Sequence, residues 1–381
     1  MIILQILLFV LVLSFLVIIH ELGHYLVAKW QKVRVEEFGV GYPPKAVTLF
    51  KKAETIFTLN WIPFGGFVKL EGEEGPETDK DEAGQVKPDA HGFLPFYAKG
   101  KISRLMIILA GASVNFIFGI VAFAIYFSVK GIPNLEPRIG MVAPNSPVAV
   151  AGVQPNVNIV SFEDNGTVYK MDSVDTVTAF VTSHLGDQVT LVTTGTCKDL
   201  SCEESAHSYP LKIRTKAETP SGQGSLGIAF DEVVAYKFYP WYEMPFRGTK
   251  FGLDQALLLS QLIITSLAAI IAGLFHGQVP QEVAGPVGIF SQARQAGFFS
   301  GDAFALLNLA GKLSVNLAIM NVLPIPALDG GRAFFILIES FIGRKRINKF
   351  EGYVNYVAFA LLLLLTVLIT FKDITALFIK K

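Results

Sequence analysis

Long stretches without a charged residue constrain this chain more than any other feature of its sequence. A transmembrane helix needs about 20 predominantly apolar residues. Ile2 to Ile19, Leu105 to Val129 and Val354 to Phe371 are apolar and carry no charge. Only 17% of all residues are charged, against roughly 25% in soluble domains. The sequence therefore predicts an integral membrane protein rather than a soluble enzyme.

A cleaved signal peptide is the alternative for the first of these stretches. Such a peptide carries basic residues before its apolar core and an Ala-x-Ala cleavage site after it. Ile2 to Ile19 has neither pattern and runs directly into a polar pentad. We expect it to be retained as a span.

Lysine and arginine lie in the loops that we expect on the cytoplasmic side of the membrane. These basic residues follow the first span, precede the second and precede the last: Lys29, Lys32 and Arg34; Lys99, Lys101 and Arg104; Arg344, Lys345, Arg346 and Lys349. This orientation places residues 131–250 outside the cytoplasm.

The polar pentad is His20-Glu21-Leu22-Gly23-His24. Two histidines four residues apart lie about 40° apart around a helix, so they can share a metal ion. Glu21 lies about 100° round from His20, which suits a general base better than a ligand. Ionisable residues within a span are costly and usually functional. The alternative is a pair of interfacial histidines beside a glutamate that reaches the membrane surface.

A zinc site that keeps one position open for water needs a third protein ligand. The other histidines lie in loops or beside a weaker apolar segment, whereas Asp329 is the only acid between Asp302 and Glu339. Two prolines and two glycines surround Asp329 and predict a broken helix that lines a cavity. An aspartate ending a helix outside the membrane is the alternative, and its apolar flanks argue against it.

The soluble stretch at 131–232 alternates short β-rich runs with turn residues. Its clearest predicted strands are Ile139–Val142, Asn158–Phe162, Gln188–Val192 and Ser225–Phe230. Ser173 to His184 predicts the one helix, capped by Asp172 or Ser173. This pattern indicates an α+β or partly open barrel module of about 90 residues. Within it, Cys197 and Cys202 are predicted to form a disulfide at a hairpin tip, with two free thiols as the alternative.

A second unusual segment lies in the first cytoplasmic-side loop, residues 29–104. Thr55 to Asn60 alternates like a strand and continues into an apolar run that contains Gly65 and Gly66. A membrane-dipping segment fits this composition, and an ordinary surface hairpin is the alternative. The acidic stretch from Glu71 to Glu82 is interpreted as a solvated loop without chemistry.

The motifs together resemble the site-2 protease family, peptidase M50, in its bacterial RseP-type branch. The resemblance covers nearly the whole chain and depends on four motifs: HELGH at 20–24, PFGGFVKL at 63–70, GPVGI at 285–289 and the Asn-x-x-Pro-x-Pro-x-Leu-Asp-Gly run at 321–330. It implies an intramembrane zinc metalloendopeptidase with one zinc ion per chain. His20, His24 and Asp329 would be the ligands and Glu21 the catalytic acid/base.

The same resemblance assigns further residues around the site. Residues 55–70 would form a membrane-associated β-hairpin that holds the substrate strand near Gly65 and Gly66. Asn115 matches the asparagine of a second-span motif, although Ala112 stands where the family has proline. The residues that would shape the active-site side of the third span are Asn316, Asn321, Pro324 and Pro326.

Residues 135–232 resemble a single PDZ domain. The matching segments are Ile139–Val142, Ser146-Pro147 and Ala151–Val153. The family's substrates are single-span membrane proteins, such as anti-sigma factors and remnant signal peptides, that an upstream site-1-type protease has already trimmed. The resemblance therefore implies a multi-pass protein of the bacterial inner membrane, with its PDZ domain extracytoplasmic and its active site towards the cytoplasm.

The predicted fold is a multi-pass α-helical membrane protein with a membrane-dipping β-hairpin and one PDZ-type α+β domain. Four spans are expected, at residues 1–28, 105–130, within 303–342 and at 353–372. Ala256 to Phe275 is apolar but contains Gln261, Thr265 and Ser266. Asp329 must reach the depth of His20 and His24 from outside, so residues 251–302 make no net crossing. We interpret Ala256–Phe275 as an interfacial or re-entrant helix in the linker at 233–302.

Two functions of other classes remain open from the sequence. One is an inactive membrane scaffold that presents a PDZ domain, and the other is a zinc transporter. An intact Glu21 argues against the scaffold, and the scarcity of further intramembrane acids argues against the transporter. A net charge of zero favours no nucleic-acid partner.

Overall fold

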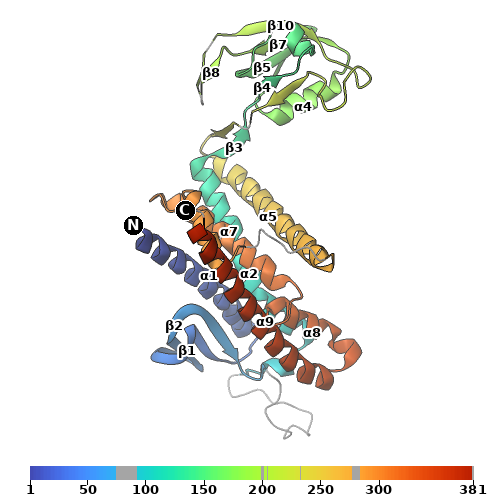
Figure 1. The fold of residues 1–381 in the computed structure, drawn as a ribbon. Helices are drawn as coiled ribbons and strands as arrows, with labels where there is room; N and C mark the ends of the chain where they lie inside the picture. The colour runs from blue at the N-terminus through green and yellow to red at the C-terminus, as the bar shows by residue number, and fades with distance from the viewer. Residues whose placement is uncertain (74–91, 199–200, 204, 232, 277–283, 380–381) are drawn as a thin grey trace. The chain divides into compact units, whose positions relative to one another are not determined.

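The computed structural model describes residues 1–73, 92–198, 201–203, 205–231, 233–276 and 284–379. The chain divides into two compact units. The helical unit comprises residues 1–129 and 242–381, and the sheet unit comprises residues 130–241. Figure 1 shows the helices of the first unit and the strands of the second.

The described part of the helical unit has five helices that are long and apolar enough to cross a membrane. They are α1 (Ile2–Trp30), α2 (Lys101–Lys130), α5 (Met244–Phe275), α7 (Ala303–Val322) and α9 (Arg344–Ile379). Shorter helices are η2 (Phe96–Ala98), α6 (Pro286–Gln295) and α8 (Asp329–Ile342). These helices confirm the prediction of a multi-pass membrane protein, whereas the number of true spans stays a prediction.

Small residues let α2 pack closely against both α1 and α7. A Cβ atom added at Gly23 of α1 would lie 2.7 Å from the carbonyl oxygen of Ala110 on α2. One added at Gly119 of α2 would lie 2.5 Å from Val315 on α7. Close approach at these small residues brings α2 together with both α1 and α7.

Helix α5 begins at Met244, well before the predicted start at Ala256. Its Gly248 lies against Ser128 of α2, and its Gly252 lies against Phe123 and Ala124. The residue numbers along α2 fall as those along α5 rise, so the two helices run antiparallel. Helix α5 starts beside the C-terminal end of α2. Helix α7 runs the same way, so both helices start at the same end of α2. Helix α5 is also long and apolar enough to be a candidate span, so its predicted interfacial or re-entrant form stays a prediction.

The predicted span region 303–342 is broken into two helices, as the prolines and glycines around Asp329 predict. Helix α7 ends at Val322 and α8 begins at Asp329, and only α7 is a candidate span. The break follows from the two intervening prolines and from Ala327, whose φ is +71°. A Cβ atom added at Gly331 would lie 2.8 Å from the carbonyl carbon of Ile325. The connecting backbone thus folds directly over the first turn of α8, where a larger residue would clash.

The prediction that residues 55–70 form a hairpin by themselves is wrong. They form one strand, β2 (Thr55–Leu70), whose antiparallel partner is β1 (Val35–Lys52). The turn lies at Ala53, whose φ is +53°, while Gly65, with φ +83°, bends β2. Register shifts let residues 35–40 of β1 pair with both 66–70 and 56–59 of β2. The glycines therefore bend a strand in a folded-over sheet and do not close a turn.

The sheet unit contains a six-stranded sheet in the order β10-β7-β5-β4-β11, with β6 paired to β5. These strands are β4 (Arg138–Val142), β5 (Val157–Asp164), β6 (Thr167–Lys170), β7 (Gln188–Thr193), β10 (His207–Lys212) and β11 (Ile228–Phe230). Helix α3 (Pro147–Val150) is short, and α4 (Val174–Ser183) starts at the N-cap Ser173 with a capping box to Thr176. The predicted strands and helix are confirmed.

Two strand pairs complete the sheet unit. Strands β3 (Ile132–Leu135) and β12 (Val234–Lys237) pair antiparallel and bring the two ends of the unit together. Strands β8 (Cys197–Lys198) and β9 (Ser201–Cys202) form the predicted hairpin tip, with Cys197 opposite Cys202 in the register. Cys197 is disulfide-bonded, which confirms the predicted oxidised state.

Candidate metal centre

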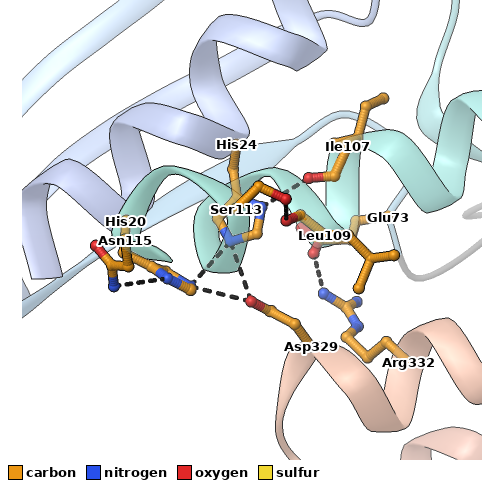
Figure 2. Close-up of polar contacts among 9 residues, drawn as sticks. All are labelled: His20, His24, Glu73, Ile107, Leu109, Ser113, Asn115, Asp329 and Arg332. Carbon is orange, nitrogen blue, oxygen red and sulfur yellow. Dashed lines mark hydrogen bonds and ion pairs between the residues drawn. The ribbon is translucent and has the colours of Figure 1, made fainter. Parts of the chain in front are cut away.

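Three side chains from two distant helices converge within the helical unit (Figure 2). His20 and His24 lie one turn apart on α1, with their Nε2 atoms 3.1 Å apart. Asp329 is the first residue of α8, and its Oδ2 lies 3.0 Å from Nε2 of His20 and 3.3 Å from Nε2 of His24. The sequence therefore identified three residues that the fold does bring together, although 305 positions separate His24 from Asp329 along the chain.

The spacing of these three atoms fits a zinc ion. Tetrahedral zinc with bonds of about 2.0–2.1 Å holds its nitrogen and oxygen ligands roughly 3.3 Å apart. Oδ2 of Asp329 is also buried and has no hydrogen-bond partner among the described residues. A buried carboxylate oxygen without a donor is costly, and a cation shared with the two imidazoles would satisfy it.

Each histidine has a neighbour suited to orient its ring. Nδ1 of His24 lies 2.8 Å from the carbonyl oxygen of Ile107 on α2. A carbonyl oxygen only accepts, so Nδ1 carries the proton and Nε2 keeps the lone pair that a metal needs. His24 is thus held in the ligand tautomer.

Asn115 of α2 is buried beside His20, with its Nδ2 placed 3.4 Å from Nδ1 of His20. Its Oδ1 is buried and has no hydrogen-bond partner among the described residues. Rotating the amide by about 180° exchanges the two atoms, and the surrounding hydrogen bonds decide which orientation is favoured. The rotated Oδ1 would accept a hydrogen bond from Nδ1–H of His20, leaving Nε2 free to bind metal. The resemblance singled out Asn115, and the structure places it beside His20, while its role stays a prediction.

Gly111 of α2 cradles the two histidine rings and was missed as a site residue. A Cβ atom added there would lie 2.7 Å from Nε2 of His20 and would also clash with Nε2 of His24. The sequence around Gly111 carried no signal that the rings of His20 and His24 would be its packing partners.

Glu21 lies beside the ligands without joining them. It is half-buried and stands outside the cluster of His20, His24 and Asp329. A Cβ atom added at Gly66 of β2 would lie 3.3 Å from Cγ of Glu21. The sheet formed by β1 and β2 therefore contacts Glu21, and the backbone at Gly66 lies against the Cγ methylene of this predicted catalytic residue.

Tyr42 of β1 is a further neighbour that the sequence did not reveal. A side chain at Gly65 would clash with the ring of Tyr42. Burial, and after it the nearby Glu21 carboxylate, raises the pKa of the Tyr42 hydroxyl above its ordinary value. Gly65 and Gly66 are thus both needed for close packing at this corner of the sheet.

The remaining predicted residues flank the break between α7 and α8. Asn316 and Pro324 are exposed, whereas Asn321 and Pro326 are half-buried. Among the described residues, no hydrogen bond joins either asparagine to the three ligand side chains, so their site roles stay predictions. Asn355 of α9 does contact the break, since its Oδ1 accepts a hydrogen bond of 3.0 Å from N–H of Ala327.

A second group of potential ligands lies in the sheet unit. Asp164, His184 and Asp187 have ligand atoms within 4.8 Å of one another. Nε2 of His184 lies 3.9 Å from Oδ2 of Asp164, wider than the roughly 3.3 Å that zinc imposes. We therefore assign no metal to this group.

Comparison with known proteins identifies a peptidase family and relatives named as proteases. The sequence model of Peptidase family M50 matches residues 8–365. Zinc metalloprotease RasP of Geobacillus kaustophilus is 28% identical, over 97% of this chain and 98% of its own. Regulator of sigma-W protease RasP of Bacillus subtilis is 26% identical, over 97% of this chain and 98% of its own.

Proposed function

Because the chain belongs to peptidase family M50 and is a metalloprotease, we propose that it binds one zinc ion per chain and cleaves single-span membrane proteins. His20, His24 and Asp329 would hold the ion, and Glu21 would be the catalytic acid/base. The observation that carries this proposal is the placement of Oδ2 of Asp329 at 3.0 and 3.3 Å from the two imidazole nitrogens.

The chemistry divides between the ion and the protein. When bound, zinc supplies Lewis acidity and lowers the pKa of a coordinated water to about 7. Glu21 takes the proton from the attacking water and later gives it to the nitrogen of the leaving amine. With its amide rotated so that Oδ1 faces His20, Asn115 would join the Ile107 carbonyl in keeping the two imidazoles in the tautomer that offers Nε2.

The substrate must present an extended backbone, because a helix hides its carbonyl groups in hydrogen bonds. Residues 66–70 of β2 pair with residues 35–40 of β1 on one side. No other strand of the described chain pairs with them. We propose that an unwound substrate segment adds to this free edge, where Gly66 would bring it past Glu21.

The relatives support a membrane-bound substrate class. One carries the name regulator of sigma-W protease, which favours anti-sigma factors, and remnant signal peptides share the same single-span form. An upstream site-1-type protease would trim these substrates first. The protein would lie in the bacterial cell membrane, with the metal centre towards the cytoplasm and the sheet unit, as a PDZ domain, outside.

The two rival functions are less well supported. An inactive scaffold would not need the converged ligands or the retained Glu21. A zinc transporter needs further free ligands along a path, but Glu339 is bound by Arg104, with Oε2 and Nη2 2.6 Å apart.

The proposal is tested by comparing the membrane proteomes of cells that carry the wild-type chain and cells that carry Glu21→Gln. We expect trimmed single-span fragments to accumulate only with Glu21→Gln. Equal fragment levels in the two strains, with both proteins present in the membrane, would refute proteolysis of this substrate class.

A further inference from the structure

Arg332 lies on the same helix as the metal ligand Asp329, one turn further along α8. Its guanidinium forms an ion pair with the carboxylate of Glu73, which lies in the turn that follows β2 (Figure 2). The two residues are 259 positions apart in the chain. A side chain on the metal-binding helix is therefore bound directly to the end of the sheet that contacts Glu21.

Glu73 is itself attached to β2. Its Oε2 lies 3.4 Å from the backbone nitrogen of Leu70 and accepts that N–H. Leu70 ends the strand segment that begins at Gly66, the residue beside Glu21. Glu73 thus links Arg332 to the same short segment that is proposed to receive the substrate strand.

A second helix, α9, also contacts Arg332. Nε of Arg332 lies 3.8 Å from Oε1 of Glu351 on α9. Helix α9 also supplies Asn355, which binds the backbone just before Asp329 at Ala327. The guanidinium has a planar fork of donors that can bind two carboxylates at once, so both carboxylates define its position.

The charged side chains of Arg332, Glu73 and Glu351 are less exposed than those of an ordinary surface ion pair. The side chains of Arg332 and Glu73 are 31% and 23% exposed, and Glu351 is 23% exposed. Exposed ion pairs contribute little to stability. Partly buried ion pairs are costly to break, because the remaining charge is left without its partner. The pair is therefore suited to hold α8 and the end of β2 in a fixed relative position.

We propose that Arg332 and Glu73 form a clasp that positions the substrate-binding edge of β2 relative to the metal-binding end of α8. Arg332 is a positioning residue: it touches neither the three ligand atoms nor the proposed substrate. The clasp sets the separation between residues 66–70, where the substrate backbone would lie, and Asp329. This inference rests on the proposed function, because it assigns the clasp a role in holding substrate for the same metal centre.

The test uses the full chain, reconstituted in lipid, with Glu73→Gln and Arg332→Gln. Each variant removes one charge and keeps a similar shape. We expect zinc content equal to wild type and kcat near the wild-type value, with KM raised by roughly 10-fold or more because the edge is no longer held in place. Arg332→Lys keeps the positive charge and should restore much of the loss. A charge exchange is unsuitable, because it would place a carboxylate against Glu351.

Arg247→Gln is the matched control. It removes an arginine of α5 from an exposed pair with Glu243, which precedes the helix; Nε of Arg247 lies 2.8 Å from Oε2 of Glu243. Its KM should equal that of wild type. Unchanged KM in both clasp variants, loss of zinc in Arg332→Gln, or no recovery in Arg332→Lys would each overturn the proposal.

A distance measurement makes the clasp testable apart from proteolysis. Spin labels at Lys69 of β2 and Leu337 of α8, both exposed, would report the separation of the two elements in a chain without the native cysteines. A narrow distance distribution that broadens with Glu73→Gln and with Arg332→Gln is expected. An identical distribution in all three chains would contradict the clasp. Absence of cleavage by the wild-type chain would instead count against the proposed function.

Discussion

The backbone of Gly66 lies against the side chain of Glu21, so closely that an added Cβ atom would stand 3.3 Å from Cγ of the glutamate. One residue comes from a bent strand and the other from a long apolar helix. Their contact places residues 66–70, an edge that no other strand of the described residues covers, beside the predicted catalytic base. The proposed function depends on this neighbourhood as much as on the metal ligands.

Gly66→Val should therefore reduce cleavage strongly while zinc remains bound. The branched side chain would press on Glu21 and on the carbonyl oxygen of Gly39, which an added Cβ would approach to 3.0 Å. A misplacement of this kind can lower turnover by about 10²-fold. Gly100→Val is the control, since nothing lies within 4 Å of its added Cβ. Normal cleavage by Gly66→Val would show that the strand edge at Gly66 does not hold the substrate.

Gly111→Ala should lose zinc although no ligand is changed. The new methyl group would occupy space held by the rings of His20 and His24. Moving α2 away to make room would break the close packing of Gly23 on α1 against Ala110 on α2. Metal analysis of the purified variant, with Gly100→Ala as control, checks this. Full zinc occupancy in Gly111→Ala would mean that the helices are less tightly packed than the structure shows.

Asn115→Leu should weaken zinc binding by about 10- to 100-fold, the usual effect of losing an outer partner of a metal-binding histidine. The reason is that Nδ1–H of His20 would lose its acceptor. Asn115→Asp retains an acceptor and should bind zinc more tightly than the leucine variant. Competition with a fluorescent chelator measures both affinities, and equal affinity of Asn115→Leu and wild type would exclude the positioning role.

The sequence predicted which three side chains converge because the pattern is local and rare. His20 and His24 are fixed by helical spacing, and Asp329 was identified by elimination among the few acids at membrane depth. Gly111 could not be found in this way, because its importance arises only when α2 packs against α1. The same holds for Tyr42, which reaches Glu21 through the folding of β1.

Long-range pairing explains what the sequence missed in the fold. Strand β1 carries Pro43, Pro44 and two glycines, so it lacks the alternation that marks a strand. The acidic stretch was interpreted as a loop without chemistry, yet Glu71 contacts Arg34 at 3.2 Å and Glu73 pairs with Arg332. The rest of that stretch, residues 74–82, and His91 lie outside the described residues. Pairs so far apart in the chain leave no periodic signal.

Removing residues 136–233 should leave the zinc site intact, because no ligand lies in the sheet unit. The ends of the excision are adjacent, since Leu135 pairs with Val234 between β3 and β12. If the unit acts as a PDZ-type filter, the shortened chain should cleave substrates whose outer domains have not been trimmed. Incubation with trimmed and untrimmed forms of one substrate checks this, and unchanged selectivity for the trimmed form would refute the filter.

The most direct test of the central claim compares zinc content and cleavage in purified wild type and Glu21→Gln, both reconstituted in lipid with a single-span substrate. The account predicts about one zinc per chain in both proteins. It also predicts that Glu21→Gln lowers the cleavage rate by at least about 10²- to 10⁴-fold, because the carboxylate moves the protons but does not hold the ion. Cleavage by Glu21→Gln at the wild-type rate, or wild-type cleavage that persists after zinc is removed, would contradict it.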